Sequence, residues 1–384
     1  MKNASSVARV EDDLLLKGQG RFVDDIELSG MLHACFVRSA LAHAKILSIQ
    51  TQDAKDLPGV HAIYTHQDLT GVIKRERIPQ AIQSGMIKFD VDPFWLAKDE
   101  VCYVGEPIAV VLADTRRAAE DAAALVYIEY ESLPVVVDPR RGLLKDSPRA
   151  RMDFESNLVA QTRVAYGEVD QAFSQAPHQL SQLFTLNKGG GHSIEARGVV
   201  AIYDRFERKL KVWDSTQMPH RAKDLLVQSL QLGEHQIRVI APDVGGGFGP
   251  KAVIHPEEIV VPALAILAER PVKWIEDRLE SFSATVLERL QYWDMQVAFS
   301  AEGRLLAIRG HLYHDHGACT PYGVALPYNA VTNLVGPYVL PALDIEISLC
   351  LTNMVPATPT RGAGRPQGTF VMERFLDKIA QTLN

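Results

Sequence analysis

The stretch GEPIAVVLADTRRAAEDAAALVYIEYESLPVVV, residues 105–137, constrains the fold of this chain more than any other. Residues 108–113 are uniformly apolar, which is typical of a buried strand. Asp114 or Thr115 can cap the helix that follows, in which alanines and Leu125 form an apolar stripe. The next residues, VYIEY, alternate in polarity as a second strand does. The pattern predicts strand, helix, strand in a βαβ unit, and its first turn lacks the glycine fingerprint of a Rossmann nucleotide site.

Composition narrows the class of protein. A length of 384 residues predicts two or three domains, and 47% hydrophobic with 23% charged residues is typical of a globular protein with a large core. The net charge of −7 argues against a nucleic-acid-binding surface. The apolar run Ile259–Ala268 is interrupted by Pro262 and is too short to span a membrane. The N-terminal twenty residues lack the apolar core of a signal peptide, so we expect a cytoplasmic protein without a membrane partner.

The cysteines point away from a metal centre built from thiolates. Cys35, Cys102, Cys319 and Cys350 lie far apart and include no CxxC pair, so neither an iron–sulfur cluster nor a structural zinc is predicted in this chain. Free buried thiols in a reducing compartment are the expectation.

A polar stretch over residues 139–157 predicts a linker before a second unit of strands and helices. In that unit HPEEIVVPALAILAER reads as a helix with acidic residues in its first turn, as the helix dipole favours. The last helix, TFVMERFLDKIAQTLN, carries an apolar side with nothing after it to pack against. The chain is therefore expected to be the front part of a larger unit. That apolar side consists of Phe370, Met372, Phe375, Leu376 and Ile379.

The glycine-rich loop DVGGGFGPK, residues 243–251, is the first candidate site. Clustered glycines let backbone N–H groups approach an anionic ligand closely. Neither GxxxxGK[ST] nor GxGxxG fits, because Pro250 interrupts both patterns. A nucleotide-binding dehydrogenase is therefore disfavoured, and a plain tight turn is the other interpretation.

Three further motifs are candidates. TPTRGAGRPQG places Arg361 and a second arginine before a helix, either as an anion-facing loop or as a solvated one. STQMPHR places Gln217 after a strand as a site-facing amide. In HLYHDHG, His314 and His316 share a strand face and His311 points away, but no third metal ligand stands at a recognisable spacing. Core histidines with hydrogen-bond partners are favoured over a metal pair.

Taken in order, the motifs resemble the molybdopterin-binding large subunit of the xanthine dehydrogenase, aldehyde oxidase and carbon monoxide dehydrogenase superfamily. GRFVDDIELSGMLHACFVRSALAHAKI, PGVHAIYTHQDL and the opening stretch resemble its α/β hammerhead domain. HSIEARGVVAIYD, WDSTQMPHR, RVIAPDVGGGFGPK and TRGAGRPQGTFVMERFLDKIA resemble its first molybdopterin-binding domain. The resemblance implies an α+β fold with the hammerhead domain over residues 15–138, the linker over 139–157 and the molybdopterin-binding domain over 158–384.

The same resemblance implies the cofactor and the residues around it. In this family a pyranopterin, often the cytosine dinucleotide form in bacteria, holds molybdenum through its dithiolene, so no side chain is expected to ligate the metal. Gly246, Gly247, Phe248 and Gly249 are expected to bind the cofactor through backbone N–H groups near its oxo ligand. Gln217 would hydrogen-bond near the same oxygen. Arg361 matches the arginine that faces the substrate, and with Gln217 it is expected to be catalytic and to contact the cofactor.

Two positions bear on the substrate. Phe248, Ala252, Gly362 and Ala363 are expected to line the substrate pocket. Purine-oxidising members have a glutamate where Ala252 stands, and carbon monoxide dehydrogenases have a cysteine where Gly362 stands. Purines and carbon monoxide are therefore disfavoured, and N-heteroaromatic compounds such as nicotinate, or aldehydes, remain.

The implied reaction is hydroxylation of an electron-poor C–H bond with oxygen from water, with electrons passing to 2Fe-2S clusters and FAD on partner subunits. The family's second molybdopterin domain, with its glutamate base, lies outside this sequence, and Glu195, Glu257 and Glu373 are not assigned that role. We expect a second molybdopterin-binding subunit to supply the base, as in split nicotinate dehydrogenase-like enzymes, together with FeS and FAD subunits. The alternative is a truncated, catalytically incompetent paralogue that acts as a binding or assembly partner.

Overall fold

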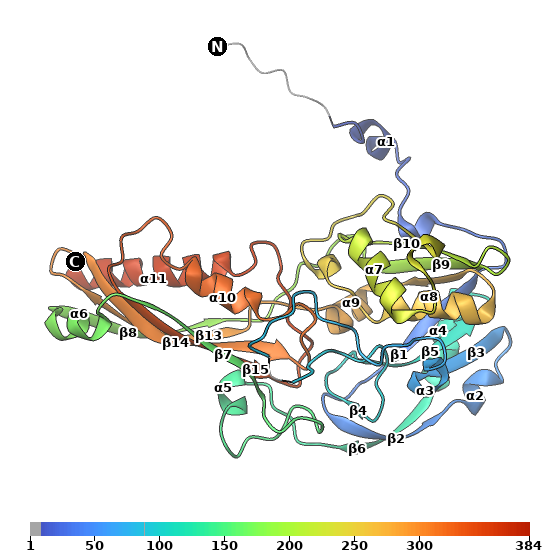
Figure 1. Cartoon of the computed structure of the whole chain (residues 1–384), viewed down its shortest axis with the longest axis horizontal. Helices are drawn as coiled ribbons and strands as arrows, with labels where there is room; N and C mark the ends of the chain where they lie inside the picture. The colour runs from blue at the N-terminus through green and yellow to red at the C-terminus, as the bar shows by residue number, and fades with distance from the viewer. Residues whose placement is uncertain (1–8, 88) are drawn as a thin grey trace, which may run out of the picture.

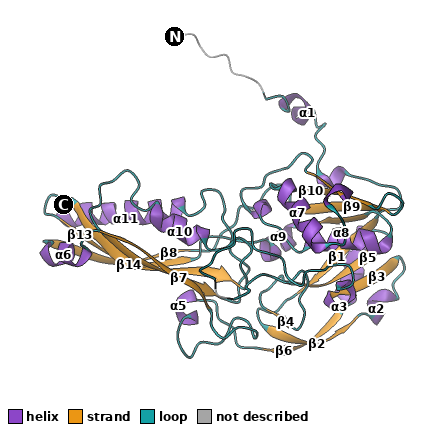
Figure 2. Cartoon of the chain, in the orientation of Figure 1, coloured by secondary structure: helices purple, strands orange, loops and turns teal. Residues whose placement is uncertain are grey.

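Three β-sheets organise the residues that the computed structural model describes, 9–87 and 89–384 (Figures 1 and 2). A seven-stranded sheet has the order β11-β10-β9-β12-β1-β5-β3, a three-stranded sheet has the order β4-β2-β6, and a five-stranded sheet has the order β7-β15-β14-β13-β8. The first two lie at one end of an elongated molecule and the third extends to the other end (Figure 1). Residues 1–8, part of the stretch in which no signal peptide is expected, lie outside the described residues.

The strands are β1 Leu32–Arg38, β2 Ala44–Gln50, β3 Val60–Thr65, β4 Glu100–Val101, β5 Pro107–Ala113, β6 Tyr127–Ser132, β7 Leu158–Tyr166, β8 His178–Leu186, β9 Gly198–Asp204, β10 Lys209–Asp214, β11 Ile237–Ile240, β12 Val272–Ile275, β13 Gln291–Phe299, β14 Leu305–Gly317 and β15 Leu343–Leu351. The α-helices are α1 Asp12–Leu16, α2 Gln52–Lys55, α3 His66–Leu69, α4 Arg116–Leu125, α5 Pro139–Gly142, α6 Val169–Gln175, α7 Pro219–Ser229, α8 Glu257–Ala268, α9 Arg278–Ala284, α10 Ala325–Thr332 and α11 Arg365–Leu383. The mixed α+β content agrees with the predicted fold class.

The stretch over residues 105–137 forms the predicted strand, helix and strand, but not a βαβ unit of one sheet. β5 is buried along its whole length, and Thr115 caps α4 by accepting a hydrogen bond from the N–H of Ala118. β6 then leaves the seven-stranded sheet and pairs with β2. Leu125 was wrongly placed on the buried stripe and is exposed. It lies about 120° around the helix from the buried Ala119.

The seven-stranded sheet crosses the polar stretch predicted to be a linker. β1, which precedes that stretch, pairs in parallel with β12, which follows it, with Leu32 opposite Val272. Residues 139–157 themselves are ordered, because the buried Asn157 side chain donates to the carbonyls of Gly142 and Pro148 and accepts from the N–H of Ala150. The polar composition of this stretch therefore reflects internal hydrogen bonds as well as surface exposure.

The last helix has a partner. The apolar side of α11 packs on the five-stranded sheet, where Phe375 is fully buried and lies edge to face with Phe184, with ring centroids 4.9 Å apart. The expectation that nothing packs against this side is wrong, because the covering sheet comes earlier in the chain. Phe370 is the exception and stays exposed.

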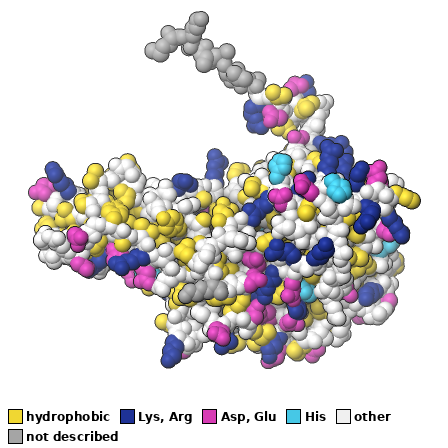
Figure 3. Space-filling model, viewed as in Figure 1, with side chains coloured by type: hydrophobic (Ala, Val, Ile, Leu, Met, Phe, Trp, Pro, Cys, Tyr) yellow, Lys and Arg dark blue, Asp and Glu magenta, His cyan; other side chains and the backbone are white. Residues whose placement is uncertain are grey.

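The surface gives a further view of the chain. Acidic and basic side chains are interspersed over the end that contains α7 and α8, whereas hydrophobic side chains gather near α10 and α11 (Figure 3). Within the described ranges, no helix combines the length and the apolar character needed to cross a membrane.

Candidate functional site

The glycine-rich loop follows β11 and ends in a short 3₁₀ turn over Pro250–Ala252. Gly246 and Gly249 have φ of 107° and 113°, and Phe248 between them has φ of 55°, so the loop runs through the left-handed region three times. A Cβ on Gly249 would lie 2.2 Å from the carbonyl oxygen of Pro359. Glycine is therefore required where this loop meets the segment that carries Arg361.

Gln217 is bonded to the loop. Its Oε1 accepts a hydrogen bond from the N–H of Gly249 at 2.8 Å, and its own N–H donates to the carbonyl of Lys251 at 2.8 Å. A Cβ on Gly247 would lie only 2.4 Å from Gln217 Oε1, so the absence of a side chain at Gly247 makes room for this amide. The side chain of Gln217 is exposed on the outer side of the loop.

Arg361 reaches the same loop from a third segment. Its N–H donates to the carbonyl of Phe248 at 2.8 Å, while its side chain is exposed and has no ion-pair partner among the residues described. Gly362 and Ala363, which follow, have φ of 105° and 48° and turn the chain into α11. The exposed positions of Phe248 and Arg361 place an aromatic ring and a guanidinium group on one rim.

The remaining predicted pocket residues belong to the same cluster. The N–H of Ala252 donates to the carbonyl of Gly249, and the N–H of Ala363 donates to the carbonyl of Thr360, both at 2.8 Å. Thr360 in turn packs against Gly249, since a Cβ there would lie 2.9 Å from Thr360 Cα. Every predicted site residue thus falls in one cluster drawn from three segments of the chain.

A count of backbone donors shows what the loop can bind. The N–H of Gly245 is taken by Glu195 and that of Gly249 by Gln217, whereas those of Gly246, Gly247 and Phe248 have no acceptor within the described residues. Consecutive free N–H donors without charged side chains suit an anionic oxygen. They fit a molybdopterin group, which brings its own metal, since they offer donors rather than carboxylate, thiolate or imidazole ligands.

Glu195 and Lys251 lie beneath the loop, and sequence reasoning gave them no role. Lys251 was considered only as the lysine of a failed nucleotide fingerprint, and Glu195 only as a base that could not be assigned. Lys251 is almost fully buried, and its ammonium group lies 3.0 Å from the Glu195 carboxylate. The signal available in the sequence was a lysine directly after a glycine loop without a phosphate motif.

A buried ionic network lies behind the site and crosses to the first segment of the chain. Glu257 in the first turn of α8 pairs with Arg38 at 2.6 Å and with Arg197 at 2.8 Å, and Arg197 also pairs with Glu276. Burial opposes the ionisation of Glu257, but the guanidinium groups of Arg197 and Arg38 outweigh it and lower its pKa. Glu257 therefore forms ion pairs, in addition to any helix-dipole effect.

The histidine motif lies apart from the glycine loop in its bonding. His314 and His316 are buried with ring centroids 5.3 Å apart, and His311 bonds to the Ser348 hydroxyl at 2.8 Å. Gln291 lies 3.2 Å from His314 Nδ1, but neither ring nitrogen of His316 has a hydrogen-bond partner within the described residues. Burial lowers the pKa of His316 to about 4. The expected hydrogen-bonded core histidine is thus found at His314 and not at His316.

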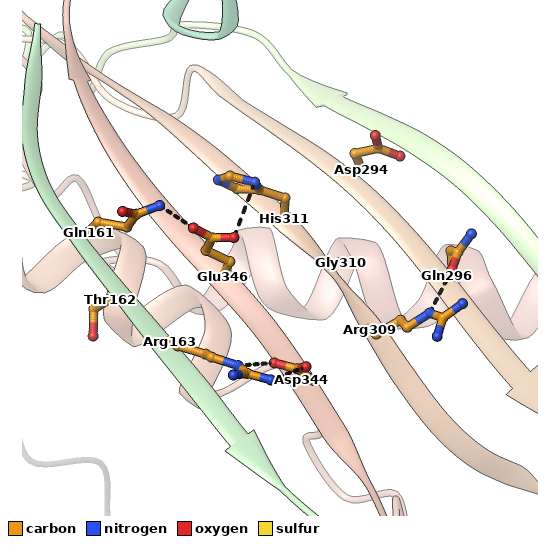
Figure 4. A pocket seen from close by; sticks show the side chains of 10 residues that line it. All are labelled: Gln161, Thr162, Arg163, Asp294, Gln296, Arg309, Gly310, His311, Asp344 and Glu346. Atoms are coloured by element: carbon orange, nitrogen blue, oxygen red, sulfur yellow. Dashed lines mark hydrogen bonds and ion pairs between the residues drawn. The ribbon is translucent and has the colours of Figure 1, made fainter. Parts of the chain in front are cut away.

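A groove of about 750 Å³ on the five-stranded sheet is separate from this cluster (Figure 4). Its charged side chains largely satisfy one another: Arg163 pairs with Asp344, and Gln161 bonds to Glu346. None of the predicted site residues lines it. The groove is therefore a polar sheet face and not the site that the motifs predict.

Comparison with known proteins places this geometry. Residues 152–384 match the family described as molybdopterin cofactor-binding domain, and residues 17–134 match the aldehyde oxidase and xanthine dehydrogenase a/b hammerhead domain. The chain belongs to the aldehyde oxidase and xanthine dehydrogenase family of molybdopterin-binding proteins.

Individual members show how much of the family's length is present. The chain is 38% identical to the nicotine 6-hydroxylase large subunit of Paenarthrobacter nicotinovorans over 98% of its own length and 46% of that subunit. It is 30% identical to the nicotinate dehydrogenase large molybdopterin subunit of Eubacterium barkeri, over 98% of its own length and 85% of that subunit. Quinoline 2-oxidoreductase from Pseudomonas putida 86 superimposes with a TM-score of 0.92 and 36% identity, covering 98% of this chain and 48% of that one. The chain thus spans about half the length of several relatives.

Proposed function

We propose that this chain is one part of a molybdenum hydroxylase that acts on an electron-poor C–H bond, in an N-heteroaromatic compound such as nicotinate or in an aldehyde. The observation that carries the proposal is the bonded cluster of Gln217, the glycine loop and the Arg361 segment, with free N–H groups at Gly246, Gly247 and Phe248. The names of the relatives, which include hydroxylases and dehydrogenases of N-heterocycles, support it.

Each residue of the cluster has a distinct role in this proposal. The free N–H groups and the Gln217 amide would hold the cofactor by hydrogen bonds, and the exposed Phe248 ring would pack against an aromatic substrate. The Arg361 guanidinium would stabilise negative charge that develops on the substrate. Molybdopterin, when bound, supplies the redox chemistry that oxidises the C–H bond with oxygen from water.

The base that removes a proton is proposed to come from a second molybdopterin-binding subunit. The three carboxylates that could compete for this role are engaged elsewhere. Glu195 bonds to Gly245 and Lys251, Glu257 is buried between two arginines, and Glu373 accepts from the Tyr338 hydroxyl at 2.8 Å. FeS and FAD subunits would then carry electrons away, and we propose the cytosine dinucleotide form of the cofactor and a cytoplasmic location.

The test is purification of the complex from its source, followed by molybdenum analysis. We expect molybdenum and a second large molybdopterin-binding chain in the same complex. A complex that contains neither would contradict the proposal and favour the truncated paralogue that acts as a binding or assembly partner.

A matched pair of variants tests the role of Gln217. Gln217→Ala should alter the paramagnetic resonance signal of molybdenum, because the amide that holds Gly249 is lost. Gln231→Ala removes another exposed amide, whose weak contact is with the carbonyl of Gly71, and should leave the signal unchanged. Identical signals from both variants and the wild type would remove Gln217 from the site.

A further inference from the structure

The glycine loop is anchored at its start by one carboxylate. Glu195 Oε2 accepts hydrogen bonds from the N–H of Gly245 at 2.7 Å, from the Ser215 hydroxyl at 2.7 Å and from the Lys251 ammonium at 3.0 Å. A Cβ on Gly245 would lie 2.4 Å from Glu195 Cβ, so the backbone of the loop rests directly on this side chain. The carboxylate thus fixes where the loop begins.

Lys251 ties the other end of the loop to the same point. Its ammonium group also donates to the Glu195 carbonyl at 3.0 Å and to the Ser215 hydroxyl at 2.6 Å. Its carbonyl accepts from the N–H of Gln217 at 2.8 Å and from the Thr216 hydroxyl at 3.2 Å. One residue therefore connects the Glu195 anchor, through its side chain, with Gln217, through its backbone.

The surroundings of Lys251 make a purely stabilising role a poor explanation. Burial lowers its pKa, and the charged groups that oppose this shift are Glu195, Glu276 and Asp214. Burial also raises the pKa of Asp214 to about 7, so much of the compensation depends on Glu195. A buried ion pair of this kind adds little net stability, because desolvation offsets the attraction between the charges. Its geometric effect on the loop is the larger consequence.

We propose that Glu195 and Lys251 are positioning residues that hold the glycine loop and Gln217 in register, without themselves contacting cofactor or substrate. The value of that register rests on the proposed function, but the coupling between ion pair and loop is a property of this chain alone. It can therefore be measured without the cofactor.

Hydrogen exchange of the full chain tests the coupling. In Lys251→Met the amides of Gly245 and Gly249 should exchange at least tenfold faster than in the wild type, while β13 keeps its protection. Lys209→Met is the matched control, since it breaks an exposed ion pair with Glu207 and should leave the loop unchanged.

A double variant separates positioning from charge burial. Lys251→Met alone leaves the Glu195 carboxylate buried without its cation, whereas Glu195→Gln with Lys251→Met leaves no unpaired charge. We expect the double variant to regain the melting temperature lost in Lys251→Met and to keep the fast exchange of Gly245 and Gly249. Loop protection that follows the melting temperature in both variants, or that never changes, would overturn the proposal.

The purified complex gives a second readout. Lys251→Met, but not Lys209→Met, should change the paramagnetic resonance signal of the molybdenum that remains bound. An unchanged signal in a complex that retains molybdenum would overturn the positioning role. A complex without molybdenum in the wild type would refute the proposed function and leave the exchange result to decide the coupling.

Discussion

Alanine substitutions at two glycines of the loop, only two positions apart, should have opposite consequences. At Gly249, φ is 113° and ψ is −44°, a conformation that costs an L-residue about 1–3 kcal/mol. The new Cβ would also lie 2.2 Å from the Pro359 carbonyl oxygen and 2.9 Å from Thr360 Cα. Both are backbone atoms, and moving them disturbs the segment that leads to Arg361. With the Gln217 hydrogen bond, worth about 1 kcal/mol, the expected loss for Gly249→Ala is roughly 2–4 kcal/mol.

At Gly247 the backbone is not in the left-handed region, and the new Cβ would meet only the exposed side chain of Gln217, 2.4 Å from its Oε1. That side chain can rotate away, so Gly247→Ala should cost less than about 1 kcal/mol of stability. The rotation nevertheless breaks the bond from Gly249 to Gln217. Gly247→Ala should therefore disturb the site while leaving the fold nearly as stable as the wild type.

Urea unfolding of the two variants and the wild type, followed by tryptophan fluorescence and far-UV circular dichroism, measures the difference. Gly249→Ala should shift the midpoint to lower urea with an unchanged slope, and Gly247→Ala should not. Equal shifts in the two variants, or a larger shift for Gly247→Ala, would refute the assignment of the close contact to backbone at one position and to a flexible side chain at the other.

Three further predictions follow from the site and its surroundings. In the intact complex Arg361→Ala should lower turnover at least tenfold with little loss of molybdenum, because the charge acts in the transition state, and equal losses of both would make Arg361 structural. Glu257→Gln should destabilise the chain by about 3 kcal/mol at pH 7 in urea unfolding, since it leaves Arg38 and Arg197 without their carboxylate, and an effect that does not shrink as pH falls below about 4 would contradict the lowered pKa of Glu257. Burial raises the pKa of Glu106 to about 7, so its contribution to stability is full below about pH 4.5 and is lost as pH rises through 7; Glu106→Gln should therefore gain up to about 3 kcal/mol relative to the wild type between pH 4.5 and 8, and a pH-independent difference would exclude the shift.

Local sequence patterns predicted elements better than they predicted the assembly of those elements. The apolar run of β5 and the cap at Thr115 follow from periodicity and hydrogen-bonding chemistry, which act within a few residues. The departure of β6 to another sheet depends on pairing with β2, which lies some eighty residues earlier. The partner of Phe375 is equally distant, since Phe184 comes from β8. No local pattern carries that information.

The site shows the same division. Gln217, the glycine loop and Arg361 were selected by residue type and order, and the structure brings them together through hydrogen bonds between distant segments. Lys251 and Glu195 could not be paired from the sequence, because their contact depends on burial beneath a loop of unknown course. Charged residues near a glycine loop look alike in a sequence, whether they face a ligand or support the backbone.

The pairing of β1 with β12 bears on how such genes can recombine. A crossover within residues 139–157 looks harmless, because the stretch is polar and separates two matched domains. It would nevertheless join β1, β5 and β3 from one parent to β9–β12 from the other within a single hydrogen-bonded sheet. The hybrid would have to keep both the alignment of Leu32 with Val272 and the pairing of Arg38 with Glu257. Selection should therefore pass these two segments on as one block, and functional chimaeras between relatives should require the exchange of both.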